Sequence, residues 1–450
     1  MPLFDRVTPV LTTNHTAVRD TNVVSPSRSL RVSNKWVAHA LTFLMVFGPG
    51  LIVMEADNDA GAVSTYVQAG AQYGTRLLWL LLLLLPICYF VQEMVVRLGI
   101  ATGQGHAAMI YRRFGKWWGH FSLADLMLVN FLTLVTEFAA IALALAKLGI
   151  DPRLGVPTAA VALTALVLTG SYRRWERIVV FLCLLDMAWF AIAFRVHANA
   201  ANVLRHSIVP SLPAGGLTGS WLFLVIAIVG TTIAPWQLFF QQSCVADKRL
   251  RFSDLKWARL DTLVGAVFTI LVAGCMMLAG NAAFIRHWDF ADPAQMAGQF
   301  ASVFGPFMKN ALLLLMINAA VLGTTTISLS SAWAYGEVRG WPHSLQKPIR
   351  EAPGFYAVYA LCVIAAAVIV LVPGAPLQLI ILSVQVLAGL MLPSAIIFLQ
   401  LLLNDREVLG DRFANKRWNN VVNWAIVSLL FVLSLLLAAQ VAVPRLFPNT

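Results

Sequence analysis

Long apolar stretches alternate with short polar connections along almost the whole chain. A membrane-spanning helix takes about 20 predominantly apolar residues, and stretches of that kind recur eleven times. The predicted membrane helices are 37–70, 77–98, 121–148, 156–172, 178–196, 220–246, 260–282, 307–334, 354–372, 377–403 and 420–443. The pattern therefore predicts an all-α polytopic membrane protein.

Polar side chains interrupt the first predicted helix. Four ionisable or amide side chains follow one another closely: Glu55, Asp57, Asn58 and Asp59. A carboxylate at mid-bilayer depth costs roughly 2.5–3.5 kcal/mol unless it has a partner or water. Gly61 comes directly afterwards and predicts a helix break, where freed backbone carbonyls face a cavity. A soluble loop between two short helices is the alternative, and the apolar residues on both sides argue against it.

The spacing of these carboxylates sets a further expectation. On a continuous helix, Glu55 and Asp59 are four residues apart and share a face, so this like-charge pair is expected to hold a proton or a cation. Asp57 lies about 200° around the helix from Asp59. The helix must therefore unwind if Asp57 and Asp59 are to face the same point.

The sixth predicted helix has a second interruption, at Thr231 to Gln237. Pro235 cannot donate a backbone hydrogen bond and disfavours helix at Ala234. Interrupted segments at corresponding positions of two halves favour an inverted-repeat transporter, with its site between the breaks. An ordinary proline-kinked helix remains the alternative at this point.

Composition and charge agree with a membrane protein. The chain has 450 residues, of which 59% are hydrophobic and 12% charged, whereas soluble domains carry roughly 25% charged residues. The net charge of +11 is attributed to topology, because most Lys and Arg residues fall on the side of the amino terminus. We expect a multi-pass protein of the plasma membrane with a cytoplasmic amino terminus, a disordered tail at 1–35 and a transporter domain at 36–450.

Other functional classes lack sequence support. The five cysteines show no CxxC spacing and the eight histidines show no ligand spacing, so neither a zinc site nor a disulfide framework is predicted. No nucleophile–base pair or HExxH motif indicates an enzyme, and nothing indicates a nucleic-acid partner or a cofactor. Asp125 and Asp186 are predicted to be buried polar anchors.

Several short motifs resemble one transporter family. They are Gly48-Pro49-Gly50, Gln68-Ala69-Gly70-Ala71, Leu77-Leu78-Trp79, Arg97-Leu98-Gly99-Ile100-Ala101-Thr102-Gly103, Glu137-Phe138 and Asp405-Arg406. Together, over about 45–415, they resemble the NRAMP (natural resistance-associated macrophage protein) divalent-metal transporters. The resemblance implies a LeuT-like fold: two inverted five-helix repeats, about 37–196 and 220–403, plus an eleventh helix at about 420–443.

The chain departs from this family at the site. The family's first-helix signature, Asp-Pro-Gly-Asn, is Asp59-Ala60-Gly61-Ala62 here, so the metal-binding aspartate is kept and the asparagine is lost. The sixth-helix signature, Met-Pro-His-Asn, is Ala234-Pro235-Trp236-Gln237 here, so the soft thioether ligand is absent. These substitutions resemble the NRAMP-related magnesium transporter branch.

The resulting predictions concern a hard cation. Mg²⁺ prefers oxygen ligands and dehydrates reluctantly, which fits carboxylates and amides around an enlarged cavity. The resemblance implies that Asp59, Thr231 and Gln385 lie at the ion, and the predicted metal ligands are Asp59, Asp57, Glu137, Thr231 and Gln385. The predicted cavity lining is Ala62, Ala234, Trp236 and Gln237, and the predicted helix breaks are Gly61 and Pro235. The chain is expected to import partly hydrated Mg²⁺, with Mn²⁺ also accepted, as a monomer in the lipid bilayer.

Proton coupling is not expected, because the family's proton-transfer positions are Trp236, Gln241 and Leu134 here, and none of these side chains titrates near neutral pH. Uniport by alternating access follows as the expectation. A proton-coupled Mn²⁺/Fe²⁺ symporter of the main family is the alternative, and the missing methionine and histidines argue against it. An amino-acid carrier is a further alternative, but its substrate carboxylate would be repelled by Asp57 and Asp59. No sequence motif supports a membrane-embedded enzyme or receptor.

Overall fold

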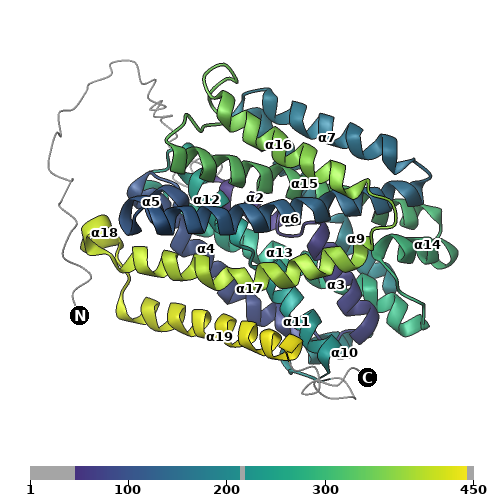
Figure 1. Ribbon diagram of the computed structural model, residues 1–450. Coiled ribbons are helices and arrows are strands. Elements are labelled where there is room, and N and C mark those ends of the chain that lie inside the picture. Colours follow the sequence, from purple (N-terminus) through teal and green to yellow (C-terminus); the bar gives the residue numbers. More distant parts are fainter. Residues whose placement is uncertain (1–45, 213–217, 443–450) are drawn as a thin grey trace, which may run out of the picture. The chain divides into compact units, whose positions relative to one another are not determined.

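The computed structural model describes residues 46–212 and 218–442, and these residues form helices without strands (Figure 1). The tail predicted at 1–35 lies outside the described residues. The described residues all belong to one compact unit, which begins at Met45.

The eleven predicted membrane helices correspond to helices or helix pairs of the described chain. The first is split into α2 (Pro49–Glu55) and α3 (Ala60–Tyr73), the fifth into α8 (Tyr172–Leu185) and α9 (Ala188–Val196), and the sixth into α11 (Gly219–Thr232) and α12 (Pro235–Asp247). The others are α4 (Leu78–Thr102), α6 (Lys116–Leu148), α7 (Pro152–Leu168), α13 (Leu255–Arg286), α15 (Pro306–Arg339), α16 (Pro353–Val370), α17 (Leu377–Asn404) and α19 (Arg417–Ala442).

Shorter helices connect the long ones. They are α5 (His106–Phe114), α10 (Ala200–Ile208), η1 (Phe252–Asp254), α14 (Pro293–Phe304) and α18 (Arg406–Phe413). By length and composition, 8 helices in the described part of the chain could cross a membrane, with each of the pairs 172–196 and 219–247 taken as one helix.

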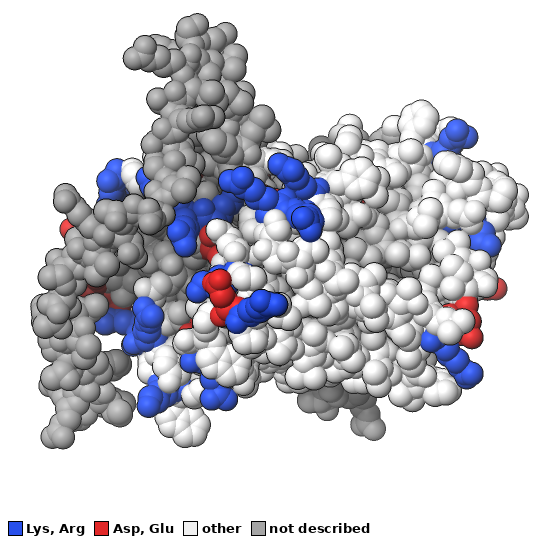
Figure 2. Space-filling view, turned by 90° about the horizontal axis from the view of Figure 1, so that it is seen from above, with Lys and Arg blue, Asp and Glu red and all other residues white. Residues whose placement is uncertain are grey.

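Charged side chains are distributed as a membrane requires. In Figure 2, Lys and Arg gather toward the end at which Figure 1 places α5 and α18, and a wide band of uncharged side chains follows. The opposite end carries a smaller, mixed group of charges. An uncharged band between two charged ends matches the hydrocarbon core of a bilayer.

The first break begins after Glu55 and ends at Asp59. Asp59 has extended backbone angles and its Oδ1 accepts a hydrogen bond from the Ala62 N–H at 2.8 Å, so it caps α3. Gly61, predicted to form the break, is therefore the second residue of α3, because the cap starts that helix at Ala60. The second break is short: Ile233 and Ala234 are extended, and Pro235 begins α12 as predicted.

Asp261 anchors the start of α2. This buried α13 carboxylate accepts hydrogen bonds from the backbone N–H groups of Gly50 at 2.7 Å, Leu51 at 3.2 Å and Gly48 at 3.4 Å. The first N–H groups of a helix have no partner within the helix, and a carboxylate there also complements the helix dipole. Asp261 therefore ties the first half of the broken helix to α13.

Glycines bring α3 and α13 into backbone contact. A Cβ on Gly280 of α13 would overlap the Val67 carbonyl oxygen and lie 2.8 Å from the Val67 carbonyl carbon. A Cβ on Gly70 of α3 would likewise overlap the Met277 carbonyl oxygen. Small residues at such crossings allow membrane helices to approach closely, so this contact holds α3 in place beside α13.

The close approach predicts that Gly280→Ala lowers stability. The added methyl group meets backbone atoms, which cannot turn away as a side chain can, and overpacking costs about 1–3 kcal/mol. Gly274→Ala, on the same helix, is the matched control, since nothing lies within 4 Å of a Cβ there. Thermal unfolding in detergent should give a lower Tm for Gly280→Ala than for Gly274→Ala. Equal Tm values would contradict the packing described for α3 and α13.

Candidate functional site

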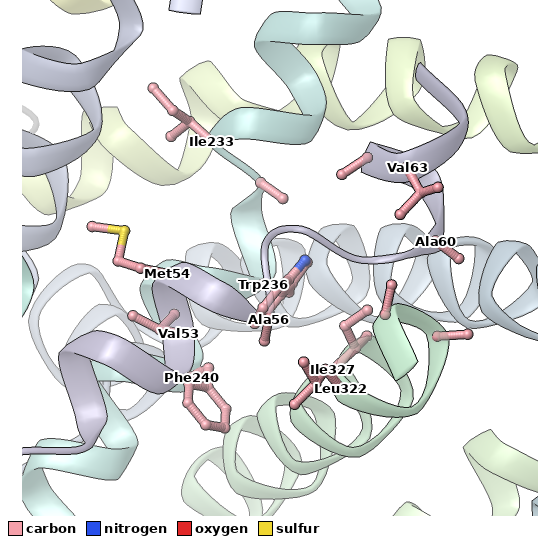
Figure 3. Packing of buried hydrophobic residues seen from close by; sticks show 14 of the residues in the cluster. Val53, Met54, Ala56, Ala60, Val63, Ile233, Trp236, Phe240, Leu322 and Ile327 are labelled. Carbon is pink, nitrogen blue, oxygen red and sulfur yellow. The ribbon is translucent and has the colours of Figure 1, made fainter. Parts of the chain in front are cut away.

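The polar side chains at the two breaks are buried together in the unit. Asp57, Asp59 and Glu137 expose 1%, 3% and 0% of their surface, and Gln385 exposes 2%. Apolar side chains surround them: Figure 3 shows Met54 and Val63 beside the first break, Ile233 at the second, and Trp236 and Phe240 on α12. Carboxylates in such surroundings require partners.

Asp59 and Glu137 form one group at the start of α3. Glu137, from α6, accepts a hydrogen bond at Oε2 from the Ala60 N–H at 3.1 Å, and Asp59 accepts from Ala62. Both side chains also lie against Gly323 of α15, where a Cβ would come within 2.7 Å of Glu137 Oε2 and 2.9 Å of the Asp59 Cβ. The amino-terminal end of α3 thus stabilises two acidic side chains.

Gln385 of α17 joins this group. A Cβ on Gly61 would overlap the Gln385 amide nitrogen and lie 3.1 Å from Asp59 Oδ1, so the amide and the carboxylate face the same glycine. The Gln385 Nε2 atom has no hydrogen-bond partner among the described residues. Because an amide offers an oxygen and a nitrogen at nearly the same place, Gln385 can present an oxygen ligand beside Asp59.

Asp57 belongs to a second group, with two glutamines. Gln92 of α4 donates from Nε2 to Gln237 Oε1 at 2.9 Å, and Gln237 of α12 donates from Nε2 to Asp57 Oδ1. The Gln92 hydrogen bond fixes the Gln237 amide so that its nitrogen faces the carboxylate. The chain Gln92–Gln237–Asp57 therefore links both halves of the site through neutral amides.

The residues of the second break border the site from α11 and α12. Thr231 is buried and its hydroxyl has no partner in the described chain. Trp236 accepts a hydrogen bond at its carbonyl from Ser330 Oγ at 2.9 Å, and its ring packs edge-on against Phe240. Ala62 and Ala234 are both buried, and their role as cavity lining stays a prediction.

Oxygen atoms without partners remain in both groups. Asp57 Oδ2, Glu137 Oε1 and Thr231 Oγ1 are buried and make no hydrogen bond with the described residues. Each unsatisfied buried group costs about 1–3 kcal/mol, and more when it is charged, so these atoms are suited to water or a cation. No three His, Cys, Asp or Glu side chains of the described segments converge on one point. A cation here would therefore be held by few carboxylates together with amide, hydroxyl and water oxygens.

Glu55 does not pair with Asp59. The expectation of a shared face was wrong because α2 ends at Glu55 and the chain is non-helical before Asp59. Instead, Glu55 accepts a hydrogen bond from Thr269 Oγ1 of α13 at 2.9 Å. The three carboxylates of the first break therefore have different partners: Glu55 has Thr269, Asp57 has Gln237, and Asp59 has the backbone of α3.

Two positioning residues were not predicted from the sequence. Gln92 is a lone amide in an otherwise apolar part of α4, and this polarity is the signal that could have identified it. Gly323 gives room to Asp59 and Glu137, and a glycine within an apolar helix carries no comparable signal.

The fold defines a class of protein. The chain shares its architecture with MhsT in complex with L-phenylalanine, with a TM-score of 0.60 at 12% identity over 89% of this chain and 98% of that chain. The Eremococcus coleocola manganese transporter, solved with an aromatic bis-isothiourea substituted compound, gives a TM-score of 0.76 at 19% identity, over 90% of this chain and 88% of that chain. The predicted LeuT-like fold of two inverted five-helix repeats plus an eleventh helix is confirmed.

The family follows from the sequence match. Residues 50–440 match the family described as natural resistance-associated macrophage protein-like, and the chain belongs to this family. The divalent metal cation transporter MntH of Staphylococcus saprophyticus is 25% identical over 442 residues, covering 92% of this chain and 95% of that protein. MntH of Staphylococcus aureus strain JH9 is 24% identical over 423 residues, covering 88% and 91%. These relatives are transporters, not enzymes, in agreement with the sequence-based prediction.

The amide chain predicts that Gln237→Leu destabilises the protein. The substitution leaves Asp57 Oδ1 buried without its donor, which costs about 1–3 kcal/mol. Gln378→Leu is the matched control, because Gln378 also donates to a single side chain, the neutral and half-buried Gln68. Tm in detergent should fall more for Gln237→Leu than for Gln378→Leu. An equal decrease would show that Asp57 does not depend on this amide.

Proposed function

We propose that this protein imports a hard divalent cation, Mg²⁺ with Mn²⁺ also accepted, as a partly hydrated ion and without proton coupling. Two lines support the proposal. The family and the names of the relatives support transport of divalent metal ions. The proposed donor atoms at the breaks are all oxygen, which favours a hard ion, and this observation is the main support for the proposal.

The proposed ligands offer only oxygen. Asp59, Glu137 and Gln385 supply carboxylate and amide oxygens on one side of the breaks. Asp57 and Thr231 supply further oxygen atoms, including two without partners in the described chain. Mg²⁺ takes oxygen ligands in near-octahedral geometry and retains several waters. Alanine is small, so positions 62 and 234 would admit such waters where larger side chains would exclude them.

Sulfur atoms near the first break are engaged with each other. Cys88 Sγ lies 3.6 Å from Met54 Sδ and 3.6 Å from the Thr232 carbonyl oxygen. Thiols and thioethers favour soft transition metals. The Cys88–Met54 contact leaves the oxygen atoms as the ligands for a hard ion in the proposed site.

A second candidate function is proton-coupled transport of Mn²⁺ or Fe²⁺. The name of the Eremococcus coleocola manganese transporter supports Mn²⁺ as an alternative ion, and the name carries no statement about protons. Two positions without a titratable side chain favour uniport: Gln241 donates to Thr262 Oγ1 at 3.1 Å and Leu134 is a buried hydrocarbon side chain, so neither can carry a proton. Burial lowers the pKa of His106, at the start of α5, to about 4, so it stays neutral near pH 7.

The distribution of charge suits import. We assign the end richer in Lys and Arg, near α5 and α18 (Figure 2), to the cytoplasm. The plasma membrane then supplies an inside-negative potential worth roughly 2.3 kcal/mol per charge per 100 mV, and twice that for a dication. The two broken helices open the proposed repeats at about 37–196 and 220–403, so alternating access would expose the ion from either side.

Asp59→Ala should abolish transport. The substitution removes the one acidic ligand of the family's first-helix signature that this chain retains. Asp59→Asn should also abolish transport while keeping the cap of α3, since asparagine also caps helices. Mg²⁺ uptake into proteoliposomes measures the effect, and elution of each variant in a single size-exclusion peak controls for folding. Uptake at the wild-type rate by folded Asp59→Asn protein would rule out the assigned site.

Ala234→Met should shift selectivity toward Cd²⁺ and Mn²⁺. The substitution supplies a soft donor and fills space for hydration water. Competition by Cd²⁺ against Mg²⁺ uptake should strengthen by about tenfold, equivalent to about 1.4 kcal/mol. Ala234→Leu is the control, since it fills similar space without sulfur and should slow Mg²⁺ uptake without favouring Cd²⁺. If Cd²⁺ competes with Mg²⁺ uptake no better in Ala234→Met than in wild type, the hardness of the ligands at this position does not set ion selectivity.

Metal entry should not carry protons in a fixed ratio. A clamped inside-negative potential should drive Mg²⁺ uptake, whereas an imposed pH gradient at zero potential should not. A pH dye trapped in proteoliposomes measures proton movement directly. Acidification of the lumen that accompanies metal entry and persists under clamp would refute uniport, and Glu137 would then be the first proton carrier to test.

A further inference from the structure

An apolar groove on the outside of the helix bundle lies between α4, α11 and α19. It encloses about 250 Å³. Every lining residue in the described part of the chain is apolar or aromatic. The lining includes Trp79, Leu83 and Ile87 of α4, Trp221 and Val225 of α11, and Leu433 of α19. The transport mechanism proposed above uses none of these side chains.

The groove has a closed floor and an open rim. Val225 and Val229 of α11 form the floor and expose 5% and 3% of their surface. Leu83 of α4 and Leu436 of α19 stand at the rim and expose 45% and 38%. Because α4, α11 and α19 are membrane helices of this fold, the rim opens into the hydrocarbon of the bilayer.

The groove is nearly as long as one leaflet is thick. Along α11 it runs from Trp221 to Val229, which is about 12 Å at 1.5 Å per residue, and the hydrocarbon of one leaflet is half of about 30 Å. Trp79 and Trp221 lie in the first turns of α4 and α11, where tryptophan marks the membrane interface. The groove therefore extends from the interface toward the midplane.

The position of α4 assigns the groove to a leaflet. This helix begins beside Trp79 and leads to α5, which lies at the end assigned above to the cytoplasm (Figure 1). The groove begins at the opposite end of α4, so in this orientation it lies in the outer leaflet.

The dimensions and the lining favour a thin apolar chain as the occupant. Apolar cavities of this order stay dry and take apolar ligands, which excludes water and ions. A volume of about 250 Å³ spread over about 12 Å leaves a mean cross-section of about 20 Å². A helix of a second copy is about 10–12 Å across with its side chains and is too wide to enter. One extended hydrocarbon chain is narrow enough.

The two halves of α19 are attached in different ways. Near its start, Asn420 accepts at Oδ1 from Gln400 Nε2 of α17 at 2.7 Å, and Asn423 donates from Nδ2 to Gln400 Oε1 at 2.9 Å. Farther along, Leu429 and Leu433 are four residues apart and present one apolar face to the groove. The second half of α19 therefore relies on apolar packing, which a lipid chain can complete.

Dispersion contacts distinguish a chain in the groove from the surrounding lipid. Acyl tails are as apolar as leucine, so a chain that leaves the bulk bilayer gains nothing from the hydrophobic effect. In the groove it contacts three helices at once, and dispersion attraction grows with the number of atoms in contact. An unfilled groove would lose these contacts.

We propose that this groove binds one acyl chain of a membrane phospholipid in the outer leaflet. The chain would fill the space between α19 and α11, the first half of the second broken helix, and so hold α11 against its neighbours. The proposal does not depend on which ion the protein transports.

The first test maps contacts of the full-length protein in proteoliposomes that contain a phosphatidylcholine with a diazirine near the end of one acyl chain. After illumination and digestion, mass spectrometry locates the lipid adducts. We expect adducts between Val225 and Val229, at the floor, which lipid outside the groove cannot reach. Leu361 of α16, which is exposed and outside the groove, reports contact with ordinary bilayer lipid. Adducts at Leu361 with none on α11 would overturn the proposal.

The second test fills the groove from its rim with Leu83→Trp. Native mass spectrometry of purified protein loaded with one synthetic phosphatidylcholine should find one lipid retained per wild-type chain, and about tenfold less retention in Leu83→Trp. Leu361→Trp is the matched control, since it replaces another exposed leucine and should retain the lipid. If Leu83→Trp does not fold, Leu436→Trp replaces it at the opposite rim.

Three results of the second test would overturn the proposal. Equal retention by wild type, Leu83→Trp and Leu361→Trp would show that the lipid lies elsewhere. Lipid retained only after removal of residues 443–450 would assign the groove to the chain's own carboxyl-terminal segment. A dimer that Leu83→Trp dissociates and Leu361→Trp does not would assign it to a second copy. None of these results bears on Mg²⁺ uptake, which tests the proposed function separately.

Discussion

The structure depends on burying several carboxylates among apolar side chains without a basic residue beside them. Asp57, Asp59 and Glu137 are almost completely inaccessible, and their partners are neutral: backbone N–H groups of α3 and the amide of Gln237. Neutral donors satisfy a carboxylate oxygen without cancelling its charge. A site stabilised in this way remains attractive to a cation, whereas an arginine at the same place would occupy it.

The helix breaks follow from the same constraint. A continuous first helix would use its backbone N–H groups internally, and none could reach Asp59 or Glu137. By ending α2 at Glu55 and starting α3 at Ala60, the chain frees the amino-terminal N–H groups of α3 for both carboxylates. Asp261 performs the equivalent task at the start of α2. Close approach of α3 to α13, through Gly70 and Gly280, then holds the broken helix in position.

Much of this arrangement could be predicted from the sequence, and the limit has a physical cause. The eleven apolar stretches predicted the membrane helices, because the bilayer imposes length and hydropathy on each one. The position of Pro235 predicted the second break. The partner of Glu55 could not be predicted, since i,i+4 spacing has meaning only on an unbroken helix, and the extent of the break depends on the cap formed by Asp59. The contacts made by Gln92 and Gly323 depend on tertiary packing, which the local sequence pattern does not determine.

We propose that an oxygen-only site between the two helix breaks selects a hard ion. Uptake of Mg²⁺, Mn²⁺ and Ca²⁺ into proteoliposomes, measured in parallel at a fixed inside-negative potential, tests it most directly. We expect Mg²⁺ to enter, Mn²⁺ to compete with it, and Asp59→Asn protein to admit neither ion. Robust Mn²⁺ uptake with no entry of Mg²⁺ would show that the site does not select a hard ion.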